Sequence, residues 1–478
     1  MTPERFVCIH GHFYQPPREN PWLEEIERQP SAVPYHDWNE RITAECYAPN
    51  AEAGNYARIS FNFGPTLLSW MEKKKPELYR AVLESDRQSM RNFSGHGSAI
   101  AQAYNHIILP LANRRDRVTQ VAWGIRDFEI RFGRKPEGMW LPETAVDVES
   151  LEILAEQGIL FTVLAPHQAL GPVDTRQAYT VSLPSGRKIA LFFYNGDISR
   201  AVAFEKLLAS GEQFARRLAG AFDPAQQGPQ LAHIAADGET YGHHYKLGDR
   251  ALTACLLALE NSGAARVTNY AEYLSKHPPS KEVEIAEKTS WSCSHGIDRW
   301  WAHCGCSSGA HPEWNQEWRT PLRNGLDQLR DAAVPLYERE AGKLFADPWA
   351  ARDRYIGVVM DRSRPSEEAF FKEQMGRVPA EPERTTALKL LELQRNALLM
   401  YTSCGWFFDD ISGIETVQVL QYAGRVIQLA SELFGQDLEP PFLEILALAK
   451  SNVPEQGDGR RVYEAFVRKN LALRAVVP

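Results

Sequence analysis

The sequence predicts a parallel α/β domain followed by a helical domain. Up to about residue 275, short apolar runs alternate with amphipathic helical segments, and this alternation is the signature of a parallel α/β architecture. Beyond Pro278-Pro279 the chain is first Trp-rich and irregular, and long helical periodicity then dominates. We therefore expect an α/β domain over residues 1–280, and a Trp-rich connector with a helical bundle over residues 281–478.

The individual elements follow from the spacing of apolar residues and from the Gly, Pro and capping residues between them. Candidate strands are 5–10, 58–63, 91–97, 138–141, 160–165, 188–194 and 231–237. In the first half, one candidate helix begins at residue 66, and the others are 120–132, 147–158, 200–218 and 249–259. In the second half, the candidate helices are 320–336, 349–360, 382–402, 414–434 and 442–449. This number of strands is enough for a barrel, but the pattern does not separate a closed barrel from an open sheet.

The composition is that of an ordinary globular protein. Its 478 residues are too many for one compact core, so we expect two or three domains. The net charge of -8 gives no basic surplus for nucleic acid or an anionic membrane, and no apolar run is long enough to span a bilayer. The first residues lack a secretory signal and the number of cysteines is odd, so we expect a cytoplasmic protein with reduced thiols.

Two carboxylates follow apolar runs in the first half. Asp237 ends the run that starts at Leu231, and Glu143 lies between a short run around Trp140 and a helix that Asp147 would cap. Chemistry in α/β proteins is found at the carboxyl ends of parallel strands, although Asp237-Gly238 is also a common turn dipeptide. Two such carboxylates are the minimal equipment of a glycoside hydrolase, in which one attacks or acts as base and the other carries a proton.

Histidines near the first strand suggest a rival reading. His10 and His12 alternate along the strand and therefore face the same side, where they could donate to a substrate or bind a metal. A metal-dependent hydrolase or deacetylase with both as ligands is thus the alternative function. We rank it below the glycosidase because Gln15-Pro-Pro and the Trp140-to-Glu143 motif have no role there. A glucan-binding protein with an inactive site is a third possibility, against which the retention of both carboxylates speaks.

Three cysteines lie close together after residue 290. Cys293, Cys304 and Cys306 could bind zinc together with His295 or His303. The spacing fits no common zinc template, so we expect packed thiols. We expect no metal and no cofactor for the reaction.

The motifs together resemble glycoside hydrolase family 57, and more closely its branch with an uncharacterised helical domain after the catalytic one. Four motifs carry the resemblance in the family's order over about the first 250 residues: His10-Gly-His12-Phe-Tyr-Gln15-Pro16, His106-Ile-Ile-Leu-Pro-Leu111, Trp140-Leu-Pro-Glu143 and Asp237-Gly-Glu239-Thr-Tyr241-Gly242-His243. The first contains an insertion, and His243-His244 stands where other members often have Trp. These departures leave open the substrate and the balance of hydrolysis and transfer.

The resemblance implies a fold, an activity and site residues. The fold would be an incomplete (β/α)7 barrel followed by a helical bundle. The activity would be retaining hydrolysis or transglycosylation of α-linked glucans, as in the family's amylases, glucanotransferases and branching enzymes. Glu143 would be the nucleophile, Asp237 the general acid/base, and an oligo- or polysaccharide the substrate. Residues expected to bind the sugar are His10, His12, Gln15, His106, Trp140, Glu239, His243 and Trp406.

Trp406 belongs to an unusual break between two long predicted helices. The segment 403–410 contains three consecutive aromatic residues followed by two acids. A cleft wall would accommodate both, with rings on the sugar face and carboxylates on its hydroxyls. The alternative is an aromatic plug that docks the bundle on the barrel.

Overall fold

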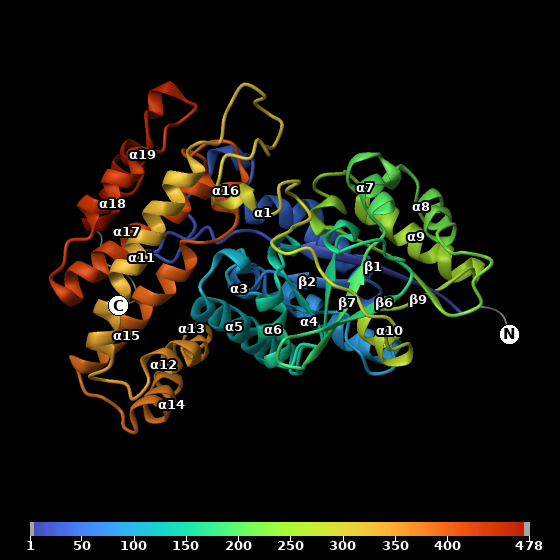
Figure 1. The fold of residues 1–478 in the computed structure, drawn as a ribbon, viewed down its shortest axis with the longest axis horizontal. Helices are drawn as coiled ribbons and strands as arrows, with labels where there is room; N and C mark the ends of the chain where they lie inside the picture. Colours follow the sequence, from blue (N-terminus) through green and yellow to red (C-terminus); the bar gives the residue numbers. More distant parts are fainter. Residues whose placement is uncertain (1–3, 473–478) are drawn as a thin grey trace. The chain divides into compact units, whose positions relative to one another are not determined.

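The computed structural model describes residues 4–472, which divide into two compact units (Figure 1). The first, the α/β unit, contains 28–104, 127–291 and the described residues up to 15. The second, the helical unit, contains 16–27, 105–126 and the described residues from 292 onward. Both units are discontinuous, whereas the sequence predicts a single boundary after residue 280. In the part of the chain that is described, no helix is long and apolar enough to cross a membrane.

The sheet of the α/β unit is centred on β1 (Arg5–Phe13), which pairs in parallel with β2 (Ser60–Phe63), β8 (Gln230–Asp237) and β9 (Arg266–Val267). Strands β1 and β8 are almost entirely buried, which explains why both are apolar runs with little alternation. Their register places His12 opposite Asp237.

Further pairs extend this sheet. The parallel pair β3 (Ala101–Gln102) and β4 (Met139–Trp140) is joined to its neighbours by bridges from Phe61 to Ala99 and from Gly138 to Phe161. Next come β5 (Phe161–Leu164) and β7 (Lys188–Phe193), and β6 (Ala178–Ser182) pairs antiparallel with β7. The predicted strands are present except for 91–97, which is wrong: these residues form the end of α4 and a turn, and the strand β3 follows only at Ala101. The sequence reading missed β3, β6 and β9.

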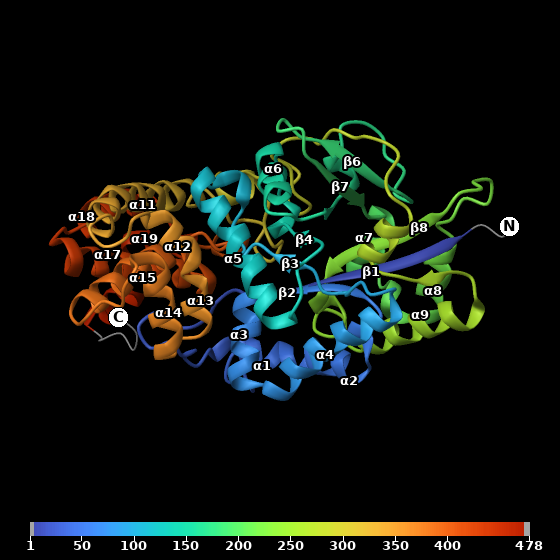
Figure 2. The same cartoon turned by 90° about the horizontal axis from the view of Figure 1, so that it is seen from below.

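Helices cover the strands of this unit (Figure 2). Side-chain caps begin several of them, because an Asp, Asn or Ser oxygen accepts from a backbone N–H of the first turn. The predicted helix 200–218 is two helices, since Lys206 is left-handed and Ser210 caps a new start. The helices are α1 (Trp38–Ile42), α2 (Ala48–Glu52), α3 (Pro65–Lys74), α4 (Pro76–Asn92), α6 (Val148–Glu156), α7 (Gly196–Phe204), α8 (Gly211–Ala219), α9 (Gly248–Ser262) and α10 (Tyr270–Lys276), with α5 (Arg114–Phe132) shared between the units.

The helical unit is built around three long helices that pack together, α11 (Arg319–Ala341), α15 (Glu383–Leu399) and α17 (Ile414–Phe434). Their buried faces are rich in Leu, Ala and Val, as the predicted periodicity requires. The shorter helices are α12 (Pro348–Arg354), α13 (Ile356–Met360), α14 (Arg364–Met375), α16 (Cys404–Phe407), α18 (Glu439–Leu446) and α19 (Gly459–Phe466).

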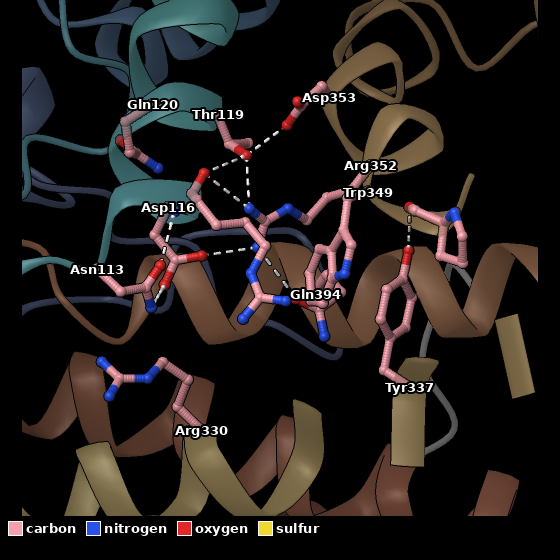
Figure 3. Close-up of polar contacts among 12 residues, drawn as sticks. Asn113, Asp116, Thr119, Gln120, Arg330, Tyr337, Trp349, Arg352, Asp353 and Gln394 are labelled. Atoms are coloured by element: carbon pink, nitrogen blue, oxygen red, sulfur yellow. Dashed lines mark hydrogen bonds and ion pairs between the residues drawn. The ribbon is translucent and has the colours of Figure 1, made fainter. Parts of the chain in front are cut away.

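A buried polar network explains why residues 105–126 belong to the helical unit (Figure 3). The Arg352 guanidinium donates to Asp116 Oδ1 over 2.7 Å, to Thr119 Oγ1 over 2.6 Å and to Gln394 Oε1 over 3.2 Å. Trp123 Nε1 in turn donates to Arg352 O over 3.1 Å. Because Arg352 is only 1% exposed, these bonds satisfy a charge that water cannot reach.

Candidate active site

Two histidines and a tryptophan form a buried stack at the end of β1. The His10 and His12 rings lie 4.8 and 5.0 Å from the Trp140 ring and nearly parallel to it. His10 Nδ1 lies 3.0 Å from Ser60 Oγ and its Nε2 3.2 Å from Asn62 Oδ1. Burial lowers the pKa of both histidines to about 3, so both are neutral at pH 7.

The stack therefore lies beneath the surface. His10 and Trp140 are 0% exposed and His12 is 4% exposed. Both ring nitrogens of His10 lie within hydrogen-bonding distance of side chains on β2, and its ring stacks on Trp140. The predicted contacts of these three residues with a sugar stay predictions.

Glu143 lies directly after β4 in a strained turn. It occupies the 3₁₀ turn Pro142–Thr144 with φ 56° and ψ 20°, and Thr144 is also left-handed with φ 50°. Non-glycine residues in this region cost about 1–3 kcal/mol and persist only where their surroundings hold them. Gln168 supplies part of that hold, since it donates to Thr144 O over 2.8 Å and accepts from Thr144 Oγ1 over 2.8 Å.

Trp291 also holds this turn and contacts the Glu143 side chain. Its backbone N–H donates to Glu143 O over 3.0 Å, and its indole Nε1 donates to Glu143 Oε2 over 3.1 Å. The indole also packs edge-on against Trp140, with 5.0 Å between the rings. Sequence reasoning missed Trp291, because it lies 148 residues from Glu143 and no local motif marks it.

Asp237 is the last residue of β8 and its side chain is exposed. The protein around it nevertheless desolvates the charged form of its carboxyl. That desolvation raises the pKa of Asp237 well above its ordinary value, and the negative charges of Glu239 and Glu143 raise it further. Asp237 and Glu143 thus share one electrostatic neighbourhood. A carboxyl that is accessible and protonated near neutral pH can act as a general acid.

Glu239 is buried and tied to the backbone. Its Oε1 accepts from Tyr14 N over 3.0 Å and from the Tyr47 hydroxyl. Burial raises the pKa of Glu239 to about 7, against the hydrogen bonds from Tyr47 and Tyr14, which lower it. It therefore joins the chain after β1 to the turn around Tyr47. Gln15 is also buried and donates to Tyr14 O over 2.9 Å.

His243 is half-buried and pairs with a carboxylate of the same unit, because its Nδ1 lies 2.5 Å from Glu45 Oε2. The sugar contacts predicted for Gln15, Glu239 and His243 stay predictions.

Two predicted site residues belong to the helical unit. His106 is left-handed and buried, its Nδ1 lies 2.6 Å from Ser403 Oγ, and Ser403 N donates to His106 O. Trp406 is 1% exposed and donates from Nε1 to Arg319 O over 3.3 Å. Trp406 is therefore part of the core of its own unit, and its predicted contact with a substrate, like that of His106, stays a prediction.

The acids after Trp406 also have partners within the helical unit. Asp409 accepts from Ser308 N over 2.7 Å, and Asp410 accepts from Asn452 N over 2.6 Å. Adjacent buried acids are thus explained by loop N–H groups that they satisfy.

Comparisons with known proteins agree with the motifs. The model of glycosyl hydrolase family 57 matches residues 11–286, and that of a domain of unknown function (DUF3536) matches residues 314–477. The chain is 25% identical over 191 residues to alpha-amylase 1 of Dictyoglomus thermophilum, covering 38% of this chain and 26% of that protein. It is 21% identical over 308 residues to the 4-alpha-glucanotransferase of Thermococcus litoralis, covering 60% of this chain and 42% of that protein. The chain thus spans less than half the length of these relatives.

A solved structure shows the fold. The exo-type maltose-forming amylase of Pyrococcus sp. ST04 superposes with a TM-score of 0.73 at 18% identity, covering 93% of this chain and 82% of that one. The predicted fold class, an incomplete (β/α)7 barrel followed by a helical bundle, is confirmed.

Proposed function

Because the chain belongs to glycosyl hydrolase family 57, we propose that it acts on α-linked glucans as a retaining hydrolase or transglycosylase. The observation that carries the proposal is the contrast between two carboxyls in one neighbourhood. Glu143 is held by the Trp291 indole, whereas the pKa of Asp237 is raised well above its ordinary value by desolvation and by the charges of Glu239 and Glu143. A carboxyl whose pKa is raised can carry the proton that a general acid must give, so we assign Asp237 as the acid and Glu143 as the nucleophile.

The reaction has two steps. Asp237 gives its proton to the glycosidic oxygen while Glu143 attacks the anomeric carbon, so the leaving sugar departs as an alcohol and a glycosyl ester forms on Glu143. Asp237 then removes a proton from water or from a sugar hydroxyl, which attacks the anomeric carbon and releases Glu143. Water gives hydrolysis and a sugar hydroxyl gives transfer. A retaining enzyme requires carboxyl groups about 5–5.5 Å apart, and we propose this separation here.

The residues around the carboxyls have supporting roles in this proposal. The Trp291 indole donates to Glu143 Oε2 and orients the carboxylate for attack. Trp140, packed between the histidines and Trp291, fixes the indole in place. Because His10 and His12 are neutral, they add no positive charge that would lower the pKa of Asp237.

Trapping of the glycosyl ester tests the assignment. A fluorinated glycosyl donor that forms the ester but releases it slowly should label wild-type protein, and peptide mass mapping should locate the label on Glu143. Glu143→Ala should prevent labelling and turnover. Asp237→Asn should cripple glucans with poor leaving groups, yet lose much less in the first step on an activated aryl glycoside. The exposed acid of α7 provides the control, Asp197→Asn. A label on another residue, or near wild-type turnover by Glu143→Ala, would refute the assignment.

Product analysis on a panel of α-glucans and α-galactosides addresses the activity itself. Reducing ends appear in hydrolysis, longer or branched chains appear in transfer, and configuration at the new anomeric centre reports retention. We expect retained configuration on an α-glucan. Inverted products would require a wider carboxyl separation and would overturn the double displacement.

A further inference from the structure

Four potential metal ligands meet in the loop that precedes α11, within the helical unit. The atoms are Sγ of three cysteines and a ring nitrogen of one histidine, and all lie within 4.8 Å of one another: Cys293, His295, Cys304 and Cys306. All three cysteines are free thiols. Packed thiols, the sequence-based expectation, would not require a histidine nitrogen at the same point.

The distances match the edges of a coordination tetrahedron. Cys293 Sγ lies 3.9 Å from Cys304 Sγ and 3.8 Å from Cys306 Sγ, and Cys306 Sγ lies 3.6 Å from His295 Nδ1. Tetrahedral zinc with Zn–S of about 2.3 Å and Zn–N of about 2.0–2.1 Å has S···S edges of about 3.8 Å and S···N edges of about 3.6 Å. A disulfide would require a sulfur separation of about 2.05 Å.

The surrounding charges fit a metal thiolate centre. Arg319 is fully buried, its guanidinium lies 4.0 Å from Cys304 Sγ, and it donates to Cys306 O over 2.9 Å. A second buried arginine, Arg299, acts on Arg319 electrostatically and disfavours its charge. Three thiolates with one divalent cation carry a net charge of about −1, which compensates this positive cluster.

The local backbone also suits a metal-held loop. Between Trp291 and α11 the regular structure consists of one short 3₁₀ turn, Asp298–Trp300. Gly296 and Gly305 have φ of 81° and 82°, and each stands next to a residue of the four-ligand group. Left-handed turns at these two glycines bring ligands from both ends of the loop to one point.

We propose that Cys293, His295, Cys304 and Cys306 bind one Zn²⁺ in a structural site. The three thiols lose their protons on binding and His295 coordinates as the neutral ring through Nδ1. Four protein ligands fill the tetrahedron and leave no position for water or substrate, so the metal holds the loop and has no part in catalysis. This site is separate from the proposed function, which uses no metal.

Metal content tests the site directly. The full chain, produced without a polyhistidine tag in zinc-supplemented medium and purified under reducing conditions, should contain about one zinc per chain by plasma mass spectrometry. Cys304→Ser/Cys306→Ser should retain less than about a tenth of that. Cys404→Ser is the matched control, because Cys404 is a half-buried cysteine of the same unit outside the cluster. His295→Ala should weaken retention against a chelator, whereas His303→Ala should not.

Cobalt substitution keeps the test valid if a variant folds poorly. Unfolded wild-type protein refolded with Co²⁺ should show the visible bands of tetrahedral cobalt and the near-ultraviolet charge transfer of cobalt thiolate. Zinc should displace cobalt and abolish both. Three outcomes would each overturn the proposal. The wild-type protein could keep its full thermal stability after the metal is removed, or the double cysteine variant could retain zinc. Thiol counting could also find a disulfide in reduced preparations.

Discussion

Trp291→Phe separates one hydrogen bond from the packing around it. Phe keeps a ring against Trp140 and the backbone N–H that donates to Glu143 O, but it removes the indole N–H that donates to Glu143 Oε2 over 3.1 Å. A hydrogen bond to a charged group contributes about 1.5–3 kcal/mol. If this bond orients the nucleophile, kcat/KM should fall about 10- to 100-fold, because about 1.4 kcal/mol corresponds to a factor of ten.

Initial rates on an α-glucan that wild-type protein cleaves provide the assay, with urea unfolding measured in parallel. Trp301→Phe is the matched control, because it removes an exposed indole bond to a carboxylate other than Glu143, that of Trp301 Nε1 to Asp298 Oδ1 over 3.0 Å. The kcat/KM of the control variant should fall by less than about twofold. Wild-type kinetics for Trp291→Phe would refute the reasoning, and so would a kinetic loss accompanied by an equal loss of stability.

Four further predictions concern buried charges and a buried ring. Activity should fall as pH rises through the pKa of Asp237, because the acid must hold its proton. Glu239→Gln removes a charge that raises this pKa, so it should shift the alkaline limb of the kcat/KM profile to lower pH. An unmoved limb would contradict this prediction. The folded state also binds the Glu239 proton more tightly than the unfolded chain does. This contribution to the free energy of unfolding is present below about pH 4.3 and is lost as pH rises through the folded pKa of about 7. Urea midpoints measured at several pH values should therefore fall over this range, and Glu239→Gln should flatten the fall. Asp116→Ala leaves the buried Arg352 charge without its carboxylate and should lower the free energy of unfolding by about 3–5 kcal/mol, and a change below about 1 kcal/mol would show the pair to be dispensable. Trp406→Ala should lower the free energy of unfolding by about 3–5 kcal/mol, because the ring is buried. Unchanged stability with slower turnover of long glucans would favour a role of Trp406 in a cleft wall instead.

The parts of the fold that the sequence predicts are those with strong local signals. Asp237 and Glu143 follow apolar runs that are buried strands, β8 and β4, so their positions at strand ends were readable from adjacent residues. The cap of α6 by Asp147 was readable for the same reason. Strand β6 was missed because its apolar pattern is short, although the turn residues Pro184-Ser185-Gly186 between it and β7 were readable as a hairpin connection.

The parts that the sequence could not predict depend on contacts between distant residues. Trp291 reaches Glu143 across 148 positions, and residues 105–126 join the helical unit through Arg352, which follows more than 220 residues later. The cysteine cluster combines two close pairs across an irregular loop, a geometry that spacing templates for zinc do not cover. In each case the deciding quantity is a distance in space, and periodicity reports only the local backbone.

The distribution of charge in the α/β unit supports the proposal that Asp237 carries the proton. The charges of Glu239 and Glu143 act there on Asp237, while His10 and His12 are held neutral by burial and supply no compensating charge. Repulsion among the acids is relieved when one of them is protonated. Glu239 is buried among donors from Tyr14 and Tyr47, so its proton exchanges with no substrate. Asp237 is exposed, and a proton placed on it can reach a bound glycosidic oxygen. The neutral histidines thus leave the pKa of Asp237 high, because a positive ring in their place would lower it.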